Sequence, residues 1–265
     1  MLPLSLVIVP RILSRSTIPR RVLQEGADPQ ETHPLVDIAW FIIGGQTPIV
    51  VDTGPAHPEF SARHHRPLTL VETLPHAAAT AGVDPGQVRI VINTHLHWDH
   101  CYGNNAFPGA RILVQRDELR YAAAPDPVQA RHYEADLGHP PFLDFYDRID
   151  VLDGDEEVAP GVRVLHLPGH TPGLMGVLVE TAAGPFLIAS DNVFLFENWN
   201  PVSPIYSGIV LDRAAYERSL HRIALIDARV LPSHDYKIGS RYPEAEVISH
   251  RAGKAAGARQ GENRE

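Results

Sequence analysis

Cysteine is nearly absent from this chain of 265 residues, because Cys101 is the only one. A single cysteine excludes an intramolecular disulfide, which is compatible with a reducing compartment. We therefore expect a cytoplasmic protein. We also expect Cys101 to be a small buried thiol rather than a metal ligand.

Positive charge is also scarce. The chain has 23 Lys and Arg against 32 Asp and Glu, a formal net charge of -9. Proteins that bind nucleic acid depend on clustered Lys and Arg to neutralise phosphates, so this balance argues against a nucleic-acid partner. A small neutral or weakly charged substrate fits the composition better.

Long apolar runs are missing as well. The opening at residues 4–9 is apolar, but no basic segment precedes it and Pro10 and Arg11 follow at once. We therefore expect an edge or core strand there and not a secretory signal. No later stretch has the length that a bilayer crossing requires, so we expect a soluble protein with no membrane partner.

The chain is long enough, and apolar enough at 44% hydrophobic residues, to bury one large core. We expect a single domain over residues 1–250 and a polar, frayed tail over residues 251–265. Residues 121–146 and 194–208 are loose stretches that could form lids or substrate loops, or simply long surface connections. A homodimer is compatible with the sequence, which leaves the oligomeric state open.

Periodicity indicates alternating strands and helices. The runs at 36–43 and 48–51 flank a glycine turn and predict two paired strands. A helical pattern covers residues 68–81 and ends at Gly82. Further expected elements are strands at 88–93, 110–115, 162–167, 186–189 and 229–231, a helix at 117–124, and a helix that Asp212 caps.

The most informative stretch is THLHWDH at residues 94–100, directly after the apolar run at 88–93. Three imidazoles and a carboxylate within six residues are far more metal-binding capacity than a fold needs, and a single zinc ion would use only three or four such groups. In an extended or sharply turning segment, His95 and His97 can point one way while Asp99 and His100 point another. The alternative is a solvated histidine cluster, but the flanking strand and the Gly-Asn-Asn at 103–105 favour a defined backbone. The motif predicts a two-metal hydrolytic site.

The second half repeats one pattern, in which a short apolar strand runs into a possible ligand. His170 follows the run at 162–167, Asp191 follows 186–189, and His234 follows 229–231. We expect these strand ends to meet at one rim. Ten other histidines match no such pattern and should be surface or hydrogen-bonded residues: His33, His57, His64, His65, His76, His132, His139, His166, His221 and His250.

These motifs resemble the metallo-β-lactamase superfamily and, within it, the N-acyl-homoserine lactonase-like branch. The matching blocks are VDTG at 51–54, HxHxDH at 95–100, PGHTPG at 168–173, Ser190-Asp191 and Ser233-His234. The resemblance implies an αββα sandwich, in which two mixed β-sheets lie face to face with helices outside. It also implies seven ligands to two metal ions: His95, His97 and His170 for the first, Asp99, His100 and His234 for the second, and Asp191 between them.

Imidazole and carboxylate ligands without thiolate suit two divalent ions, of which Zn²⁺ is the expected one and Mn²⁺, Fe²⁺ or Co²⁺ are also compatible. A hydroxide bridging two such ions could attack an acyl carbon. Asp99 could orient that nucleophile and pass its proton to the leaving group, so we expect it to be catalytic. Asp52 could orient a ligating histidine without coordinating metal, or be a turn residue.

One departure from the lactonases concerns the substrate. They often carry a tyrosine three positions after the bridging aspartate, where this chain has Phe194. Tyr206 and Tyr102 are candidate substitutes for binding the substrate carbonyl, although each could be an ordinary packed aromatic. Together with Phe194 and Tyr206, Phe196 and Trp199 suggest an aromatic wall over the site, with core packing as the alternative.

The leading hypothesis is hydrolysis of an N-acyl-homoserine lactone or a related cyclic ester. The main rival keeps the same site but opens an amide, a thioester or a β-lactam-like ring, since fold does not settle substrate. A nuclease would need a basic groove, and a diiron flavoprotein would replace His97 with a carboxylate. A binding protein without chemistry would be expected to have lost ligands, and all seven are present.

Overall fold

Two β-sheets packed face to face form the centre of the molecule. The computed structural model describes residues 6–55 and 66–241. In this part of the chain the first sheet contains, in spatial order, β4 (Leu68–Leu70), β1 (Val7–Pro19), β2 (Thr32–Ile43), β3 (Ile49–Val51), β5 (Ile90–Ile92), β6 (Arg111–Gln115) and β7 (Ile149–Leu152). The second contains β12 (Arg229–Leu231), β11 (Gly184–Ile188), β10 (Met175–Thr181), β9 (Val162–His166) and β8 (Glu156–Ala159).

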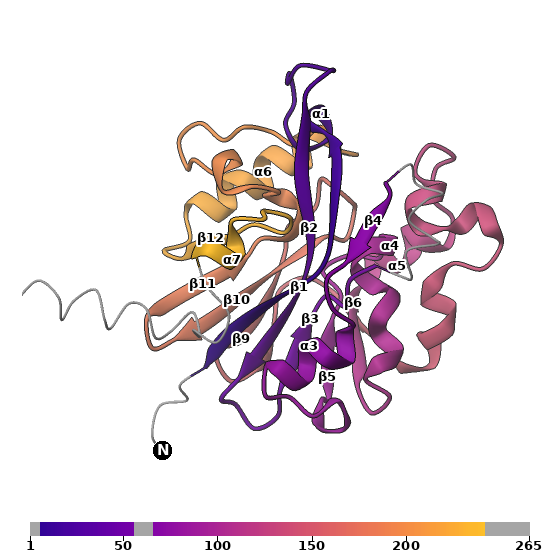
Figure 1. Ribbon diagram of the computed structural model, residues 1–265, viewed down its shortest axis with the longest axis vertical. Coiled ribbons are helices and arrows are strands. Elements are labelled where there is room, and N and C mark those ends of the chain that lie inside the picture. The colour runs from indigo at the N-terminus through magenta and orange to yellow at the C-terminus, as the bar shows by residue number, and fades with distance from the viewer. Residues whose placement is uncertain (1–5, 56–65, 242–265) are drawn as a thin grey trace, which may run out of the picture.

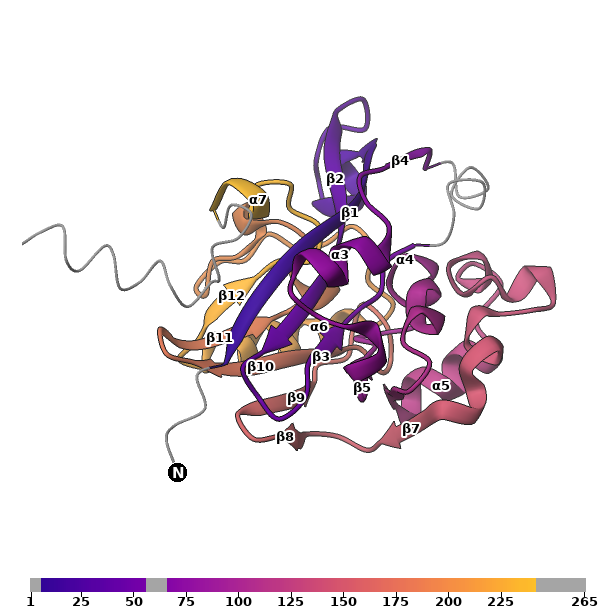
Figure 2. The ribbon, with the colours of Figure 1, turned by 60° about the horizontal axis from the view of Figure 1, so that its bottom comes forward.

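Both sheets are mixed. Strands β4, β1, β2 and β3 pair in antiparallel fashion, whereas β3, β5, β6 and β7 run parallel. In the second sheet β12 pairs in parallel with β11, and the other neighbours are antiparallel. The chain crosses from the first sheet to the second between β7 and β8 (Figure 2).

Helices lie around the two sheets in the described part of the chain. They are α1 (Arg20–Leu23), α3 (Leu74–Thr80), α4 (Trp98–Cys101), α5 (Arg116–Ala123), α6 (Arg213–Ala224) and α7 (Ile238–Arg241). Figure 1 shows α6 on the side of β9 to β12, and α3, α4 and α5 on the opposite side. It also shows the long β1–β2 pair projecting beyond its neighbours, with α1 near its end.

The buried apolar residues match these four layers. One cluster lies between the sheets and joins side chains from both, such as Trp40, Ile92 and Val177. A second cluster lies between the first sheet and α3, and a third between the second sheet and α6. The expected αββα sandwich with two mixed sheets is therefore confirmed.

The helix expected over residues 68–81 was wrong in its first part. Leu68–Leu70 is β4, which pairs with Ser14–Ser16 of β1, and α3 begins only at Leu74. Thr73 caps it by accepting a hydrogen bond from the backbone of His76, and Pro75 occupies its first turn, the one part of a helix that tolerates proline well. Gly82 follows the helix with a φ of 74°, as expected of a terminating glycine.

The opening strand was also underestimated. It does not stop at Pro10 but continues to Pro19. Strand β4 pairs only with residues 14–16 of β1, so at Pro10 the described strands pair with β1 on one side alone, where a missing N–H is tolerated. Residues 4 and 5, the tail at 251–265 and His57, His64, His65 and His250 lie outside the described residues.

The two stretches considered as lids have some regular structure. Residues 121–146 contain the end of α5 and 3₁₀ turns that begin at Ala130, Ala135 and Pro141, and residues 194–208 contain one at Phe196–Asn198. Within residues 6–55 and 66–241, no helix is long and apolar enough to cross a bilayer.

Candidate metal centre

The seven side chains expected to bind metal come together at one edge of the sandwich. His95 and His97 lie in the loop after β5, and Asp99 and His100 lie in α4. His170, Asp191 and His234 come from the loops that follow β9, β11 and β12. The first sheet thus supplies four of these residues and the second sheet three.

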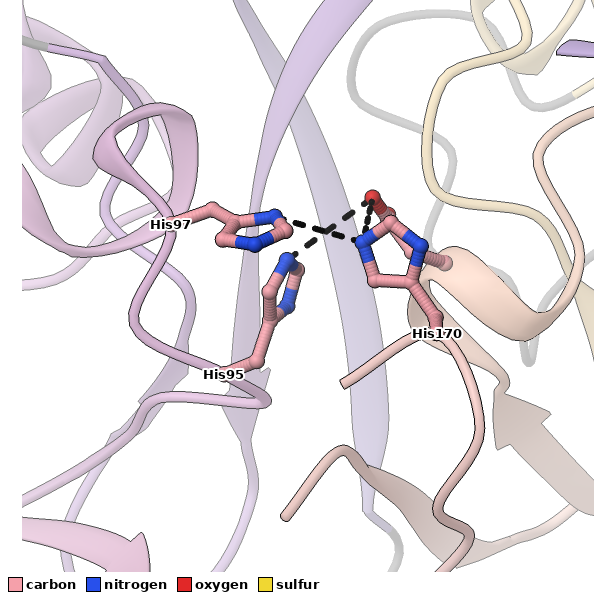
Figure 3. Close-up of side chains that lie close together, drawn as sticks. His95, His97 and His170 are labelled. Carbon is pink, nitrogen blue, oxygen red and sulfur yellow. Dashed lines mark hydrogen bonds and ion pairs between the residues drawn. The ribbon is translucent and has the colours of Figure 1, made fainter. Parts of the chain in front are cut away.

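Their ligand atoms form two groups, in each of which they lie within 4.8 Å of one another. His95, His97, His170 and Asp191 form the first group, and Asp99, His100 and His234 form the second. Figure 3 shows the imidazoles of His95, His97 and His170 pointing towards one another. Within this group, His170 Nε2 lies 3.2 Å from His97 Nδ1.

Asp191 faces both groups. Its Oδ2 lies 3.3 Å from His170 Nε2 and 3.8 Å from His95 Nε2. Its Oδ1 lies 3.2 Å from His234 Nε2 and 3.4 Å from His100 Nε2. A carboxylate in this position can provide one oxygen to each of two cations.

The unused hydrogen-bonding atoms test whether metal ions fit this site. Nε2 of His95, His97 and His100, and Oδ1 of Asp191, are buried without a hydrogen-bond partner. Buried polar atoms are normally paired, so a group of unpaired acceptors pointing at the same space indicates that a ligand belongs there. These atoms are of the types that bind Zn²⁺ and similar divalent ions, so the residues fit a metal centre.

The other ring nitrogens are held by the protein, which fixes the orientation of the imidazoles. Nδ1 of His100 pairs with Asp52 Oδ2 at 2.8 Å, Nδ1 of His170 with the Ile209 carbonyl at 2.9 Å, and Nδ1 of His234 with the Val36 carbonyl at 2.8 Å. Such partners aim a histidine at a metal and set its tautomer.

Asp52 has further contacts that suit this supporting position. Its two oxygens accept hydrogen bonds from the backbone N–H and the hydroxyl of Thr94, both at 2.8 Å. It sits directly after β3 with a φ of 53°, an uncommon backbone angle outside glycine. Asp52 can therefore orient His100 and the start of the HxHxDH loop together.

Protonation in the site is divided between neutral and charged groups. Burial lowers the pKa of His95 and of His97, and neighbouring imidazoles lower it further. Burial opposes the charged form of His100, but Asp191 and Asp52 outweigh it and raise the pKa of that imidazole. Burial likewise opposes ionisation of Asp191, yet His100 and His234 hold its pKa well below the usual value. The carboxylates that attract protons here would also attract cations.

Asp99 is the ligand candidate that the sequence also predicts to be catalytic. It lines a cavity of about 570 Å³ beside the metal centre. Arg66 donates a hydrogen bond to Asp99 Oδ2 and another to Asp37, and these three side chains are largely buried. Burial disfavours the charged carboxylate, but His100 and Arg66 outweigh it and keep the pKa of Asp99 below its usual value.

Two functional contacts escaped the sequence analysis. Arg66 belongs to no recognisable motif, and the residues next to it in the sequence do not indicate that it is buried. Glu118 lies in α5, where it accepts four hydrogen bonds from the two metal-binding loops and from Tyr133. The one sequence signal for Glu118 is that it lies on the same face of the helix as the buried Ala122, four positions later.

The aromatic residues considered for substrate binding are placed differently from one another. Phe194 lines the cavity, stacks on His234 with a centroid distance of 5.4 Å, and meets His170 edge-on at 5.7 Å. Tyr102 instead donates to Glu134, and Tyr206 packs against Tyr216 and Arg213.

Among the Phe, Tyr and Trp side chains of the described residues, Phe194 and Trp98 line the cavity. The expected wall of Phe194, Phe196, Trp199 and Tyr206 therefore reduces to Phe194, because the other three pack into the core clusters. His132, expected to be an ordinary surface or hydrogen-bonded residue, lines the cavity with its ring 5.2 Å from that of His97.

The fold and the His/Asp cluster define a metallohydrolase. The chain belongs to the metallo-β-lactamase superfamily, whose family model matches residues 38–234. It is 40% identical over 126 residues to an N-acyl homoserine lactonase of a Bacillus species, a match that covers 46% of each chain. It is 28% identical over 218 residues to the N-acyl homoserine lactonase AiiB of Agrobacterium fabrum, covering 74% of this chain and 77% of that protein.

The first of these matches spans about half the length of the relative. The similarity of the folds extends further. A crystal structure of a quorum-quenching N-acyl homoserine lactone lactonase superposes with a TM-score of 0.74, covering 92% of this chain and 97% of that one at 24% identity. This likeness establishes the shared fold.

Proposed function

We propose that this protein hydrolyses a lactone, either an N-acyl-homoserine lactone or a related cyclic ester. The observation that carries the proposal is the group of unpaired imidazole and carboxylate atoms beside a cavity of about 570 Å³. A cavity of that size suits a small organic molecule. The similarity to N-acyl homoserine lactonases supports a lactone as that molecule.

Two divalent ions, with zinc as the preferred metal, would be held by the seven side chains. His95, His97 and His170 would bind the first and Asp99, His100 and His234 the second, with Asp191 between them. When bound, such ions lower the pKa of water towards neutrality and stabilise negative charge on a carbonyl oxygen.

Asp99 handles the proton in the proposed reaction. Arg66 holds its Oδ2, whereas Oδ1 lies 3.9 Å from His100 Nε2, on the side of the second ligand group. Oδ1 would therefore both face the metal and accept the proton of the attacking water. A bond then forms between the water oxygen and the lactone carbonyl carbon, and the ring C–O bond breaks. Asp99 returns the proton to the departing ring oxygen, which gives a hydroxy acid.

The cavity wall would position the rest of the substrate. Ile18, Val22 and Leu35 line it from the β1–β2 side, and Val128 lines it from the stretch after α5. These side chains can pack against an acyl chain. Phe194 adds an apolar ring against His170 and His234 but has no hydroxyl to hold the substrate carbonyl. Residues 121–146 and 194–208 contribute to this wall and remain our candidates for substrate loops.

The function is tested by metal content and substrate screening together. We expect about two metal ions per chain, and faster hydrolysis of lactones than of matched amides, thioesters and β-lactams, with acid release followed in a pH-stat and amide cleavage followed by chromatography of the products. A protein that binds metal but prefers thioesters or amides would have the rival activity. A protein that binds no metal and hydrolyses none of these substrates would contradict the proposal altogether.

A further inference from the structure

Glu118 connects the two loops that carry the first group of candidate ligands. Its Oε1 accepts from the backbone N–H of Leu96, the residue between His95 and His97, at 2.9 Å. Its Oε2 accepts from the hydroxyl of Thr171, the residue after His170, at 2.7 Å and from the N–H of Gly173 at 3.2 Å. One carboxylate therefore ties both loops together.

The surroundings of Glu118 leave little freedom for another arrangement. Its side chain is fully buried, and Tyr133 donates a further hydrogen bond to Oε1 at 2.9 Å. The PGHTPG loop lies so close to α5 that a Cβ on Gly173 would come within 2.2 Å of the backbone nitrogen of Glu118. Four donors converge on an acceptor that takes no part in the proposed chemistry and contacts neither metal group.

We propose that Glu118 is a positioning residue that holds His95, His97 and His170 at the spacing required by the first metal ion. A carboxylate can accept all four hydrogen bonds, whereas the isosteric amide of glutamine must turn an NH₂ group towards donors. Glu118→Gln should therefore loosen one loop or the other while keeping the volume of the side chain. None of the four hydrogen bonds of Glu118 goes to α4 or to the loop that carries His234, so the second metal group should be much less affected.

The test is a metal titration of the metal-free full-length protein with Co²⁺ and Zn²⁺, in competition with a chromophoric chelator. Glu118→Gln should weaken one of the two binding events by about tenfold or more, the usual cost of losing a partner behind the ligands, and leave the other within about threefold. The d–d absorption of the Co²⁺ protein should change for the weakened site. Asp117→Asn, which removes an exposed carboxylate from the same turn of α5, should change neither quantity.

A purely structural role predicts a different pattern. Glu118→Gln would then lower the urea stability of the metal-free protein, but both metal ions would bind the folded fraction with native affinity and native spectra. That result, or equal weakening of both ions, would overturn the proposal. If the variant does not fold, Thr171→Val and Tyr133→Phe each remove one donor while leaving the carboxylate. Thr171→Val should selectively weaken binding of the first metal ion. Native metal binding by both variants would count against the proposal.

A second inference comes from the charge of the cavity wall. The whole chain carries a net charge of -9, yet the described lining contains Arg21, Arg66 and Arg131. The carboxylates of that lining are Asp99 and Asp191, and both belong to the metal groups. Arg66 is already paired with Asp37 and Asp99, but Arg21 and Arg131 are exposed and have no acidic partner among the described residues.

We infer that the cavity favours a substrate with an anionic group, such as a carboxylate, remote from the bond that is cleaved. Arg21 lies on α1 and Arg131 in the 3₁₀ turn Ala130–Tyr133, so two separate segments direct positive charge at one cavity. This inference rests on the proposed function, because it treats the cavity as the substrate site. It makes the expectation from the composition, a small neutral or weakly charged substrate, more specific.

Binding without turnover tests this inference independently of lactone hydrolysis. Calorimetry on the metal-loaded full-length protein compares adipate with hexanoate, which lacks the second carboxylate. The double variant Arg21→Gln/Arg131→Gln should weaken adipate binding about fivefold and hexanoate binding less than twofold. The control Arg120→Gln/Arg163→Gln alters arginines that do not line the cavity. Equal adipate binding by variant and native protein, or no adipate binding at all, would overturn it, whether or not lactones are hydrolysed.

Discussion

Asp99 is the residue on which the proposed chemistry depends most directly. Asp99→Asn keeps the size of the side chain but removes its ability to take up a proton and return it. Turnover at saturating metal should fall about 100-fold or more, the usual contribution of general acid–base catalysis. Circular dichroism should show an unchanged fold. Near-native turnover by the variant, with native metal content, would show that the proton passes through another group.

Arg66 affects both the site and the stability of the fold. Its side chain is about 10% exposed, its guanidinium bridges Asp37 and Asp99, and its Nε donates to Ser16. Arg66→Gln leaves two carboxylates without their cation, so the free energy of unfolding in urea should fall by about 3–5 kcal/mol.

The matched control is Arg111→Gln, which breaks an exposed pair with Asp150. That change should cost less than about 1 kcal/mol. If Arg66→Gln cost no more than this control, the buried cluster would not contribute to stability as its geometry indicates.

At the scale of elements, the loop that carries His170 is seated against the start of α6. Gly169 has a φ of 143°, and its carbonyl accepts from the N–H groups of Leu211 and Asp212 at 2.8 and 2.9 Å. A Cβ on Gly169 would lie 2.3 Å from the Cα of Tyr216. Any side chain at this position must push the loop and the helix apart.

Gly169→Ala should therefore lower the free energy of unfolding by about 3 kcal/mol, through backbone strain and overpacking. It should also weaken metal binding, because His170 moves with the loop. Gly45→Ala is the control, since its new Cβ would meet Leu6 at an ordinary 3.4 Å. Chemical denaturation and metal titration of both variants check this, and a native-like Gly169→Ala protein would contradict it.

Local patterns were sufficient to predict most of the elements that carry the site. The strand before His95 and the strands before His170, Asp191 and His234 were visible as short apolar runs followed by a ligand type. Errors arose where distant parts of the chain decide the outcome. Leu68–Leu70 is a strand because it pairs with β1, more than fifty residues earlier. Nothing near residue 68 in the sequence indicates that partner.

The same limit applies to the residues around the site. The contacts of Glu118 depend on burial and on two loops that meet only in the folded chain. Tyr102 is a candidate substitute for the tyrosine missing at position 194, and its sequence neighbours do not indicate that its hydroxyl donates to Glu134. Motifs and strand-end patterns identified the residues that could bind metal and the supporting Asp52, but they did not identify Glu118 or Arg66.

At the scale of the whole molecule, the candidate metal centre joins the two sheets. His95, His97, Asp99 and His100 follow β5 of the first sheet, whereas His170, Asp191 and His234 follow strands of the second. In each group, residues from both sheets contribute ligand atoms. Metal binding should therefore hold the two sheets together at this edge. Without metal, the unpaired buried groups would repel one another or draw water into the site.

Metal removal should accordingly destabilise the entire fold. A ligand present at about 100 times its dissociation constant stabilises the native state by about 2.7 kcal/mol. For a chain of this size that corresponds to a rise in Tm of about 5–10 °C. Treatment with a chelator, followed by its removal, should lower Tm by this amount and abolish lactone hydrolysis. Stoichiometric Zn²⁺, Co²⁺ or Mn²⁺ should restore both, whereas Ca²⁺, which prefers oxygen ligands, should not. A Tm that responds to neither chelator nor Zn²⁺ would mean that the seven side chains do not share a metal between the sheets.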